Sequence, residues 1–356
     1  MKKNLAAAIG VIGAFGAMAA ASASAQTNVQ IYGIADVGIE YLTNAGGTPA
    51  NSENLVRMAS GNLSGSRIGF RGTEDLGSGL KAIFTLENGF EIDTGALAQG
   101  GRLFGRNAFV GLQSELGALT FGRQQNALYD LMIKYDPMTF SARYSALMHD
   151  ANFTGRIDNT VKYTGNVGGF TATALYSFGR NQDGEVPGNS RVSRNIGAGL
   201  NYAGGPIGVG IAYDQFQGNT IATAGQSSKR IMAGASYDLG AVKLFGAYRW
   251  LKDEIVAAGT PAVRADVYWL GASYKAAPSV VINGAVYRTD RKGSQADPTS
   301  FVLSTVYSLS KRTDVYGNLG LARNKAGSNL GLSGVGSSIV AGENQTGVLV
   351  GVRHRF

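Results

Sequence analysis

The last strand of the chain runs to the final residue and ends in an aromatic side chain. In GVLVGVRHRF, the side chains of Val350, Val352 and Phe356 fall on one face of a strand. Arg353 and Arg355 fall on the other. A strand that uses up the C-terminus leaves a sheet edge with unpaired backbone groups, and the first strand of the chain is the natural partner for that edge. The sequence therefore predicts a closed β-barrel.

The first 25 residues have the form of a secretory signal. Two lysines open the segment, an Ala- and Gly-rich apolar stretch follows, and Ala23-Ser24-Ala25 supplies a small-residue cleavage site. A membrane helix is the alternative, but this stretch is somewhat short for one. We expect cleavage after residue 25 and a single barrel domain over 26–356.

The composition favours an all-β protein. The chain holds 52 Gly and 7 Pro with 44% hydrophobic residues, which is too apolar for disorder and too glycine-rich for a helical protein. Cysteine is absent, so an exported chain of this kind gains no stability from disulfides. Closure of the hydrogen-bond ladder would supply it instead, because an unpaired amide in hydrocarbon costs several kcal/mol.

Apolar and polar residues alternate along the predicted strands. Residues 29–41 place Val29, Ile31 and Ile39 on one face, and Asp36 and Glu40 on the other. Residues 80–87 and 242–250 repeat the pattern. A soluble sandwich shows the same alternation, so this pattern alone leaves both folds open.

The connections between the strands distinguish a membrane-spanning barrel from a soluble sandwich. Seven tight turns alternate with eight long polar connections, which gives 16 antiparallel strands. The long connections cover 42–61, 92–101, 125–158, 181–191, 217–228, 252–264, 291–298 and 324–343. Short turns at one rim and long loops at the other are typical of bacterial outer-membrane barrels, and a barrel of this size leaves an aqueous lumen.

Several segments also resemble one protein family. They are SGSRIGFRGTEDLGSGLKAIFTLENGF, GRLFGRNAFVGL, LTFGRQ, KRTDVYGNLGLA and the terminal VGVRHRF. In this order they are similar to the general diffusion porins of β-proteobacteria. The resemblance implies a homotrimer of 16-stranded transmembrane barrels in which the third long loop folds into the lumen and narrows it.

In this sequence that constriction loop is 125–158, the longest connection. It carries many apolar side chains, among them Leu128, Met138, Phe140 and Leu147, and we expect these to pack against the inner wall. The resemblance also implies that the terminal Phe356 is the signal that the outer-membrane assembly machinery binds.

Arginines are the predicted positive side of the constriction. Arg67 and Arg71 share one face of a strand, opposite Ile68 and Phe70. Arg106 has the parity of residues that would face outward, so alternation alone leaves its side undecided. The family places an arginine cluster at its constriction, and the resemblance carries that role to Arg67, Arg106 and Arg156.

Loop carboxylates are the predicted negative side. Asp130, Asp136, Asp150 and Asp158 lie in the constriction loop beside few cations. Opposed charges would create a transverse field that orients polar solutes. Because basic residues are in excess, with a net charge of +6 once the two signal lysines are removed from the full chain's +8, we expect a modest preference for anions.

The function that follows is passive diffusion of small ions and hydrophilic solutes across the outer membrane of a Gram-negative cell, in contact with its lipid. A solute-specific channel and an adhesin or receptor barrel are the alternatives. We expect no enzyme, cofactor or metal site, because the two histidines have no nucleophile motif and metal ligands are not clustered. Nucleic-acid binding, the usual inference from a basic chain, lacks a recognisable module.

Overall fold

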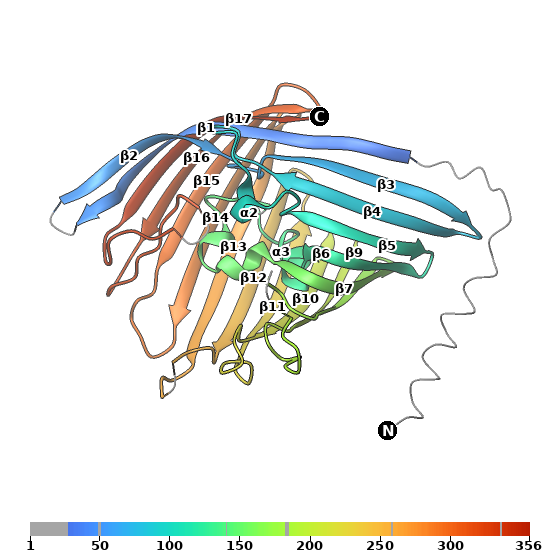
Figure 1. Cartoon of the computed structure of the whole chain (residues 1–356). Coiled ribbons are helices and arrows are strands. Elements are labelled where there is room, and N and C mark those ends of the chain that lie inside the picture. Colours follow the sequence, from blue (N-terminus) through green and yellow to red (C-terminus); the bar gives the residue numbers. More distant parts are fainter. Residues whose placement is uncertain (1–27, 49–50, 140, 182–184, 258, 335–336) are drawn as a thin grey trace.

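The computed structural model describes residues 28–48, 51–139, 141–181, 185–257, 259–334 and 337–356 (Figure 1). The predicted signal over 1–25 and Phe140 lie outside the described residues.

Antiparallel strands form nearly all of the described chain. They are β1 (Asn28–Thr48), β2 (Asn51–Ser60), β3 (Arg67–Gly77), β4 (Leu80–Gly89), β5 (Asn107–Ser114), β6 (Gly117–Gln125), β7 (Arg156–Val167), β8 (Phe170–Ser177), β9 (Asn195–Gly204), β10 (Ile207–Gln217), β11 (Ser227–Asp238), β12 (Val242–Asp253), β13 (Val263–Ala277), β14 (Val280–Arg291), β15 (Thr299–Ser308), β16 (Thr313–Arg323) and β17 (Gln345–Arg355). The short helices are α2 (Ala98–Gly101), α3 (Ala127–Met132), η2 (Ala146–Met148) and η3 (Ala151–Thr154).

The sheet closes into a barrel of 16 positions, as the sequence predicts. β1 pairs with β3 through residues 28–34 and with β2 through residues 37–48, so β2 and β3 together occupy one position beside it. Its other edge pairs with β17, from Ile34 opposite Arg355 to Leu42 opposite Gly347. The seven predicted turns are confirmed as the short connections from β3 to β16.

The prediction of a long loop over 42–61 is wrong. β1 and β2 continue through most of this range as a paired hairpin, with a register shift between Leu42 and Gly46. The polar residues Thr43 and Asn44 weaken the alternation there, although Thr43 donates to the Thr346 oxygen in β17 and Asn44 donates to the Asn344 oxygen just before it. Polar composition alone therefore does not distinguish a loop from a strand that extends beyond the membrane.

The two faces of the wall differ in chemistry. Outward side chains such as Ile31, Val350 and Leu270 are 61%, 63% and 67% exposed. Their inward neighbours include the buried Asp36 and Glu40. This is the arrangement of a barrel with hydrocarbon outside and a polar interior.

The largest apolar cluster lies between the wall and the chain that joins β6 to β7. Leu128, Tyr135 and Leu147 from this connection are buried with Met232 and Trp269 from the strands. Tyr135 also accepts, through its backbone oxygen, a 2.9 Å hydrogen bond from Trp269 Nε1. The cluster fixes the connection against the strands from β8 to β16.

The barrel closes at Gly33 and Phe356. The Gly33 amide donates to the Phe356 oxygen at 2.9 Å, and the Phe356 amide donates to the Gly33 oxygen at 3.1 Å. A Cβ added at Gly33 would overlap the Phe356 ring and lie 2.7 Å from the Arg67 carbonyl oxygen. Glycine is therefore required where the first and last strands meet. Within the described ranges, no helix has the length and apolar character needed to cross a membrane.

Replacing Gly33 with alanine should destabilise the barrel by about 1–3 kcal/mol, the usual cost of overpacking. Thermal unfolding in detergent, followed by the shift in gel mobility on heating, measures the effect. Gly284→Ala is the matched control, because nothing lies within 4 Å of an added Cβ there. Equal midpoints for the two variants would contradict this account of the closure.

Candidate functional site

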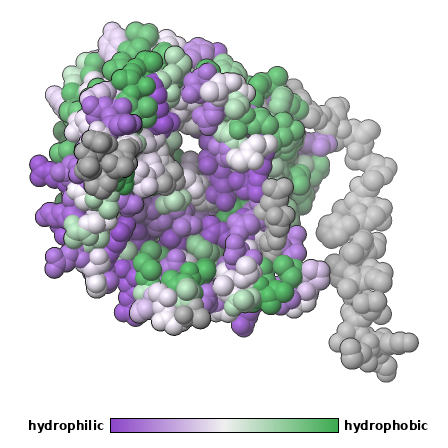
Figure 2. Space-filling view, turned by 60° about the vertical axis from the view of Figure 1, so that its left-hand side comes forward, coloured by the Kyte–Doolittle hydropathy of each residue, from purple (hydrophilic) through white to green (hydrophobic). Residues whose placement is uncertain are grey.

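Two adjoining cavities lie between the wall and the connection from β6 to β7. The first has a volume of about 450 Å³ and the second about 600 Å³. They share the lining residues Gln99, Thr154 and Arg156. Figure 2 shows the hollow in this face of the molecule, with mostly hydrophilic residues around it.

Arg67 and Arg106 meet at one carboxylate on the wall of the first cavity. Arg106 Nε donates to Glu87 Oε1 at 2.6 Å, and Arg67 NH1 lies 4.0 Å from Glu87 Oε2. Tyr32 and Asn107 also donate to Glu87, at 2.9 and 3.3 Å. Glu87 is 4% exposed and is fully engaged by these donors.

Arg106 is placed by the break in the chain before its strand. β5 begins at Asn107, so alternation does not apply to the residue that precedes it. The backbone amide of Arg106 donates to the backbone oxygen of Glu87 at 3.2 Å, which holds this part of the chain beside β4. The parity that left its side undecided in the sequence is therefore irrelevant at this position.

Arg156 lies between the two cavities. It opens β7, directly after Gly155, whose φ of 61° turns the chain out of η3. The Asn126 amide donates to the Gly155 oxygen at 2.7 Å, so the two ends of the connection are tied together there. Arg156 Nε is buried without a hydrogen-bond partner among the described residues. Its guanidinium charge is not neutralised by an ion pair with any described carboxylate.

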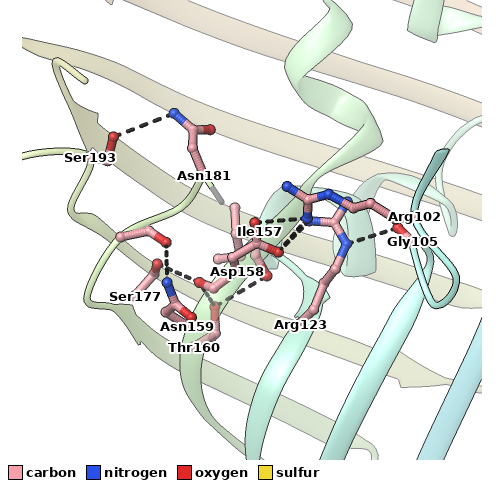
Figure 3. Close-up of polar contacts among 11 residues, drawn as sticks. Arg102, Gly105, Arg123, Ile157, Asp158, Asn159, Thr160, Ser177, Asn181 and Ser193 are labelled. Carbon is pink, nitrogen blue, oxygen red and sulfur yellow. Dashed lines mark hydrogen bonds and ion pairs between the residues drawn. The ribbon is translucent and has the colours of Figure 1, made fainter. Parts of the chain in front are cut away.

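The second cavity has its own arginine pair. Arg102 NH1 donates to both carboxylate oxygens of Asp158 at 2.8 Å, and Arg123 NH1 donates to Asp158 Oδ1 at 2.6 Å (Figure 3). Arg123 Nε also donates to the Gly105 oxygen at 2.8 Å. Arg180 lines the same cavity.

Sequence reasoning missed Arg102, Arg123 and Arg180 as site residues. Arg102 and Arg180 lie outside the strands, where no period assigns a face. Arg123 has the parity of the outward Phe121, but the register of β6 against β7 shifts between Gly122 and Gln124. Gly122 has a φ of 128°, which L side chains rarely adopt, and the bulge marked by this register shift re-aims the next side chain. An arginine directly after a glycine inside a predicted strand is the sequence signal that could have identified Arg123 as an inward residue.

Of the four predicted loop aspartates, Asp158 lines the second cavity and the other three lie elsewhere. Asp130 pairs with Lys162 at 2.5 Å, and Asp136 accepts from Tyr287 at 2.6 Å. Asp150 accepts from Arg230 at 2.8 Å. None of these three carboxylates lines either cavity. The structure thus brings Arg67, Arg106 and Arg156 together but does not set the three aspartates opposite them.

Arg71 is also apart from the cluster. It is exposed, donates to Gln30 Oε1 at 2.8 and 2.6 Å, and lies 5.1 Å from the centre of the Tyr32 ring. Neither cavity includes it.

The charge of the lining is strongly positive. The first cavity is lined by Arg67, Arg106, Arg143 and Arg156 with Glu91 as the acid, and the second by Arg102, Arg123, Arg156 and Arg180 with Asp158. Burial lowers the pKa of Arg143 and of Arg180, yet a guanidinium stays protonated in proteins. The arrangement gives both cavities a net positive charge, which would attract anions.

Two adjacent side chains hold the connection to the opposite wall. The ring nitrogens of His149 lie 2.8 Å from Thr289 Oγ1 and 2.8 Å from Ser300 Oγ. Burial, with Arg249 and Arg291 nearby, lowers the pKa of His149 to about 3, so the ring is neutral. For Asp150, burial raises the pKa but Arg230 and Arg249 outweigh it and lower the pKa to about 2.

Across the described residues, no group of three or more His, Asp or Glu side chains is placed to hold a metal ion. His149 uses both ring nitrogens in structural hydrogen bonds, so it is not poised as a base.

Comparison with known proteins gives a consistent result. A family model described as Gram-negative porin matches residues 6–327. An outer membrane porin protein of Bordetella pertussis and outer membrane porin protein 32 of Delftia acidovorans are each 34% identical over all of both chains. The solved anion-selective porin from Comamonas acidovorans matches with a TM-score of 0.80 and 31% identity, covering 93% of this chain and 100% of that one. The trimer form of OmpT from Vibrio cholerae matches at 0.69 and 16%, a likeness of fold alone, with 93% and 99% covered.

Acid should weaken the attachment of the connection between β6 and β7 to the barrel wall at His149. Its pKa is depressed in the folded protein, so the unfolded chain binds the extra proton and stability falls as the pH drops below about 6.5. Between pH 6.5 and 5 the loss should be about 1.6 kcal/mol, because the imidazole of the unfolded chain is half protonated at pH 6.5 and the slope reaches 1.36 kcal/mol per pH unit only below that. Thermal unfolding of the native protein and of His149→Gln across this range measures it. The variant should show a shallower pH dependence, and identical slopes would contradict the assignment.

Proposed function

The chain belongs to the Gram-negative porin family, and from that premise we propose that its channel weakly favours anions. As a porin it is a multi-pass protein of the outer membrane that lets small hydrophilic solutes diffuse passively. The family and the fold point to a channel rather than an enzyme. The proposal that this channel favours anions over cations rests on the arginines around the two cavities.

The observation that carries the proposal is the imbalance of charge between the cavities and the rest of the inner face. Arg156 lines both cavities without a compensating carboxylate, whereas the inner carboxylates are engaged elsewhere. Asp36 accepts from Tyr316 at 2.5 Å and Glu40 pairs with Arg57 at 2.6 Å. In a narrow, low-dielectric passage an unneutralised cation favours anions more than it would in bulk water.

We also propose that the chain from Asn126 to Gly155 is the constriction loop. Its support is the apolar cluster that packs Leu128 and Leu147 against the strands, the hydrogen bonds of His149, and the ion pairs of Asp150. The buried aspartates then have a mechanical role, because they hold the loop rather than form the acidic half of a transverse field.

The remaining parts of the proposal concern biogenesis and assembly. A signal over 1–25 is removed on export, the terminal Phe356 binds the assembly machinery, and three copies associate into a trimer. The trimer form of OmpT from Vibrio cholerae has the same fold, which supports such an assembly here.

A general pore accounts for the described inner face better than the alternatives do. A solute-specific channel would be favoured by a continuous path of aromatic or basic side chains along the lumen. The arginines described here instead gather in one region, so we rank a solute-specific channel below a general pore. A receptor role for the long loops is compatible with a pore.

Neutralising Arg156 should lower the chloride-to-potassium permeability ratio about twofold to fivefold, which corresponds to about 0.5–1 kcal/mol of ion–side-chain energy. Arg106→Gln should shift selectivity further toward potassium, because it also frees the buried Glu87 carboxylate. Reversal potentials in planar bilayers measure both effects. Arg191→Gln, an exposed position outside both cavities, is the control. A ratio unchanged by Arg156→Gln would remove this residue from the conduction path.

The trimer is tested by native mass spectrometry of the protein extracted in mild detergent without heating. We expect one species of three times the mass of the mature chain, and current steps in threes when that species inserts into a bilayer. A monomer that conducts in single steps would contradict the trimer and leave the pore intact.

A further inference from the structure

One position of the barrel wall is interrupted by a short segment that leaves the sheet. β2 ends at Ser60 and β3 begins at Arg67. On β1 these two residues pair with Val37 and Ile34, so six residues of chain lie opposite two. Most of residues 61–66 line the first cavity instead of extending the strand. We call residues 61–66 the inner segment.

The inner segment contacts the arginines of the first cavity. Arg67 Nε donates to the Gly65 oxygen at 2.9 Å. A Cβ added at Gly65 would lie 2.9 Å from Arg106 NH1. Arg143 Nε, from the connection between β6 and β7, donates to Asn62 Oδ1 at 2.8 Å. The inner segment thus adjoins three of the four arginines that line this cavity.

Arg143 is held by neutral groups. Besides its bond to Asn62, it donates through NH1 to the backbone oxygen of Ser333 and through NH2 to that of Ser60, the latter at 3.4 Å. Among the described residues it forms no ion pair with a carboxylate. Its positive charge is therefore not neutralised at the wall of the cavity.

The backbone next to Arg143 directs the following side chain to the wall. Tyr144 has a φ of 57°, which is uncommon outside glycine. Its hydroxyl donates to Glu40 Oε1 at 3.1 Å, and its ring occupies the space that a side chain at Gly320 would need. Tyr144 is thus fixed on the strands, whereas the Arg143 guanidinium depends on Asn62 and on two backbone oxygens.

The orientation of the Asn62 amide is set by the groups behind it. Asn62 is 0% exposed, and its Nδ2 donates to the Ala59 backbone oxygen at 2.8 Å and to the Tyr316 hydroxyl oxygen at 3.0 Å. Tyr316 in turn donates its proton to Asp36 Oδ1 at 2.5 Å. A backbone carbonyl cannot donate and the Tyr316 proton is already engaged, so the amide nitrogen must face these two groups. The amide oxygen therefore faces Arg143.

From these contacts we propose that Asn62 is a positioning residue for ion selectivity, which holds the Arg143 guanidinium at the wall of the first cavity. The inference rests on the proposed function, a channel in which cavity arginines favour anions. The role requires a neutral acceptor, because a carboxylate would fix the guanidinium but cancel its charge. Without the anchor, the flexible side chain would sample many rotamers, and its charge would spend less time at the cavity wall.

The test is a double-mutant cycle on the full protein, measured as the chloride-to-potassium permeability ratio in planar bilayers. R143Q should lower the ratio about twofold, and N62A about 1.5-fold, because two backbone oxygens still hold part of the guanidinium. In the R143Q background, N62A should change the ratio no further, because the residue through which it acts is gone. N318A is the matched control, since Asn318 is also buried but lines neither cavity, and it should leave the ratio unchanged.

The shift in gel mobility on heating shows whether each variant has formed a barrel. If N62A does not fold, Y316F takes its place in the cycle, because it removes one of the two acceptors that orient the amide. It should likewise lower the ratio in the native background and leave the ratio of R143Q unchanged.

Two results would overturn the proposal. One is an unchanged ratio in R143Q or in N62A, and the other is an equal effect of N62A with and without Arg143. A native channel that favours potassium would instead contradict the proposed function. The cycle would still show in that case whether Asn62 acts through Arg143, so the two failures are distinguishable.

Discussion

The structure depends on the requirement that every backbone amide in hydrocarbon be paired. β1 and β17 meet from Ile34 to Leu42, and the last hydrogen bonds of that seam join Gly33 and Phe356. Without this seam the sheet would expose two edges to lipid, at several kcal/mol for each unpaired group. Closure also separates the two faces of each strand, so that apolar side chains lie outside and polar side chains inside.

The closed wall provides the surface on which the connection from β6 to β7 is fixed. His149 and Asp150 reach Thr289, Ser300 and Arg230 on strands far away in the chain. Buried ion pairs often contribute little net stability, and we infer that here they specify one arrangement of the connection where a purely apolar contact would permit several. Because the aspartates are held on that side, the arginines on the other side keep a net positive charge. In our proposal, selectivity therefore follows from where this connection is anchored.

Much of the fold could be predicted from the sequence, because alternation, turn glycines and the terminal aromatic are local signals. The seven turns and the inward face of Asp36 and Glu40 are of this kind. The strand character of residues 42–48 and 51–60 was not predictable, since polar residues in a hairpin beyond the membrane have no apolar face to mark them. The site was predicted only in part. The inward side of Arg67 follows from the alternation of its strand. The side of Arg123 does not, because a bulge re-aims it. The pairing of Asp150 with Arg230 joins residues 80 positions apart in the chain, so no local pattern indicates it.

The most direct test of this account is the reversal potential of the native protein in a planar bilayer under a KCl gradient at neutral pH. The KCl concentrations on both sides should be low, because charges on the channel wall are screened less at low salt and then affect the permeability ratio more. The account predicts a potential of the sign carried by chloride, which diminishes as the salt concentration rises on both sides. A potential of the sign carried by potassium would contradict the claim that unneutralised arginines line the passage.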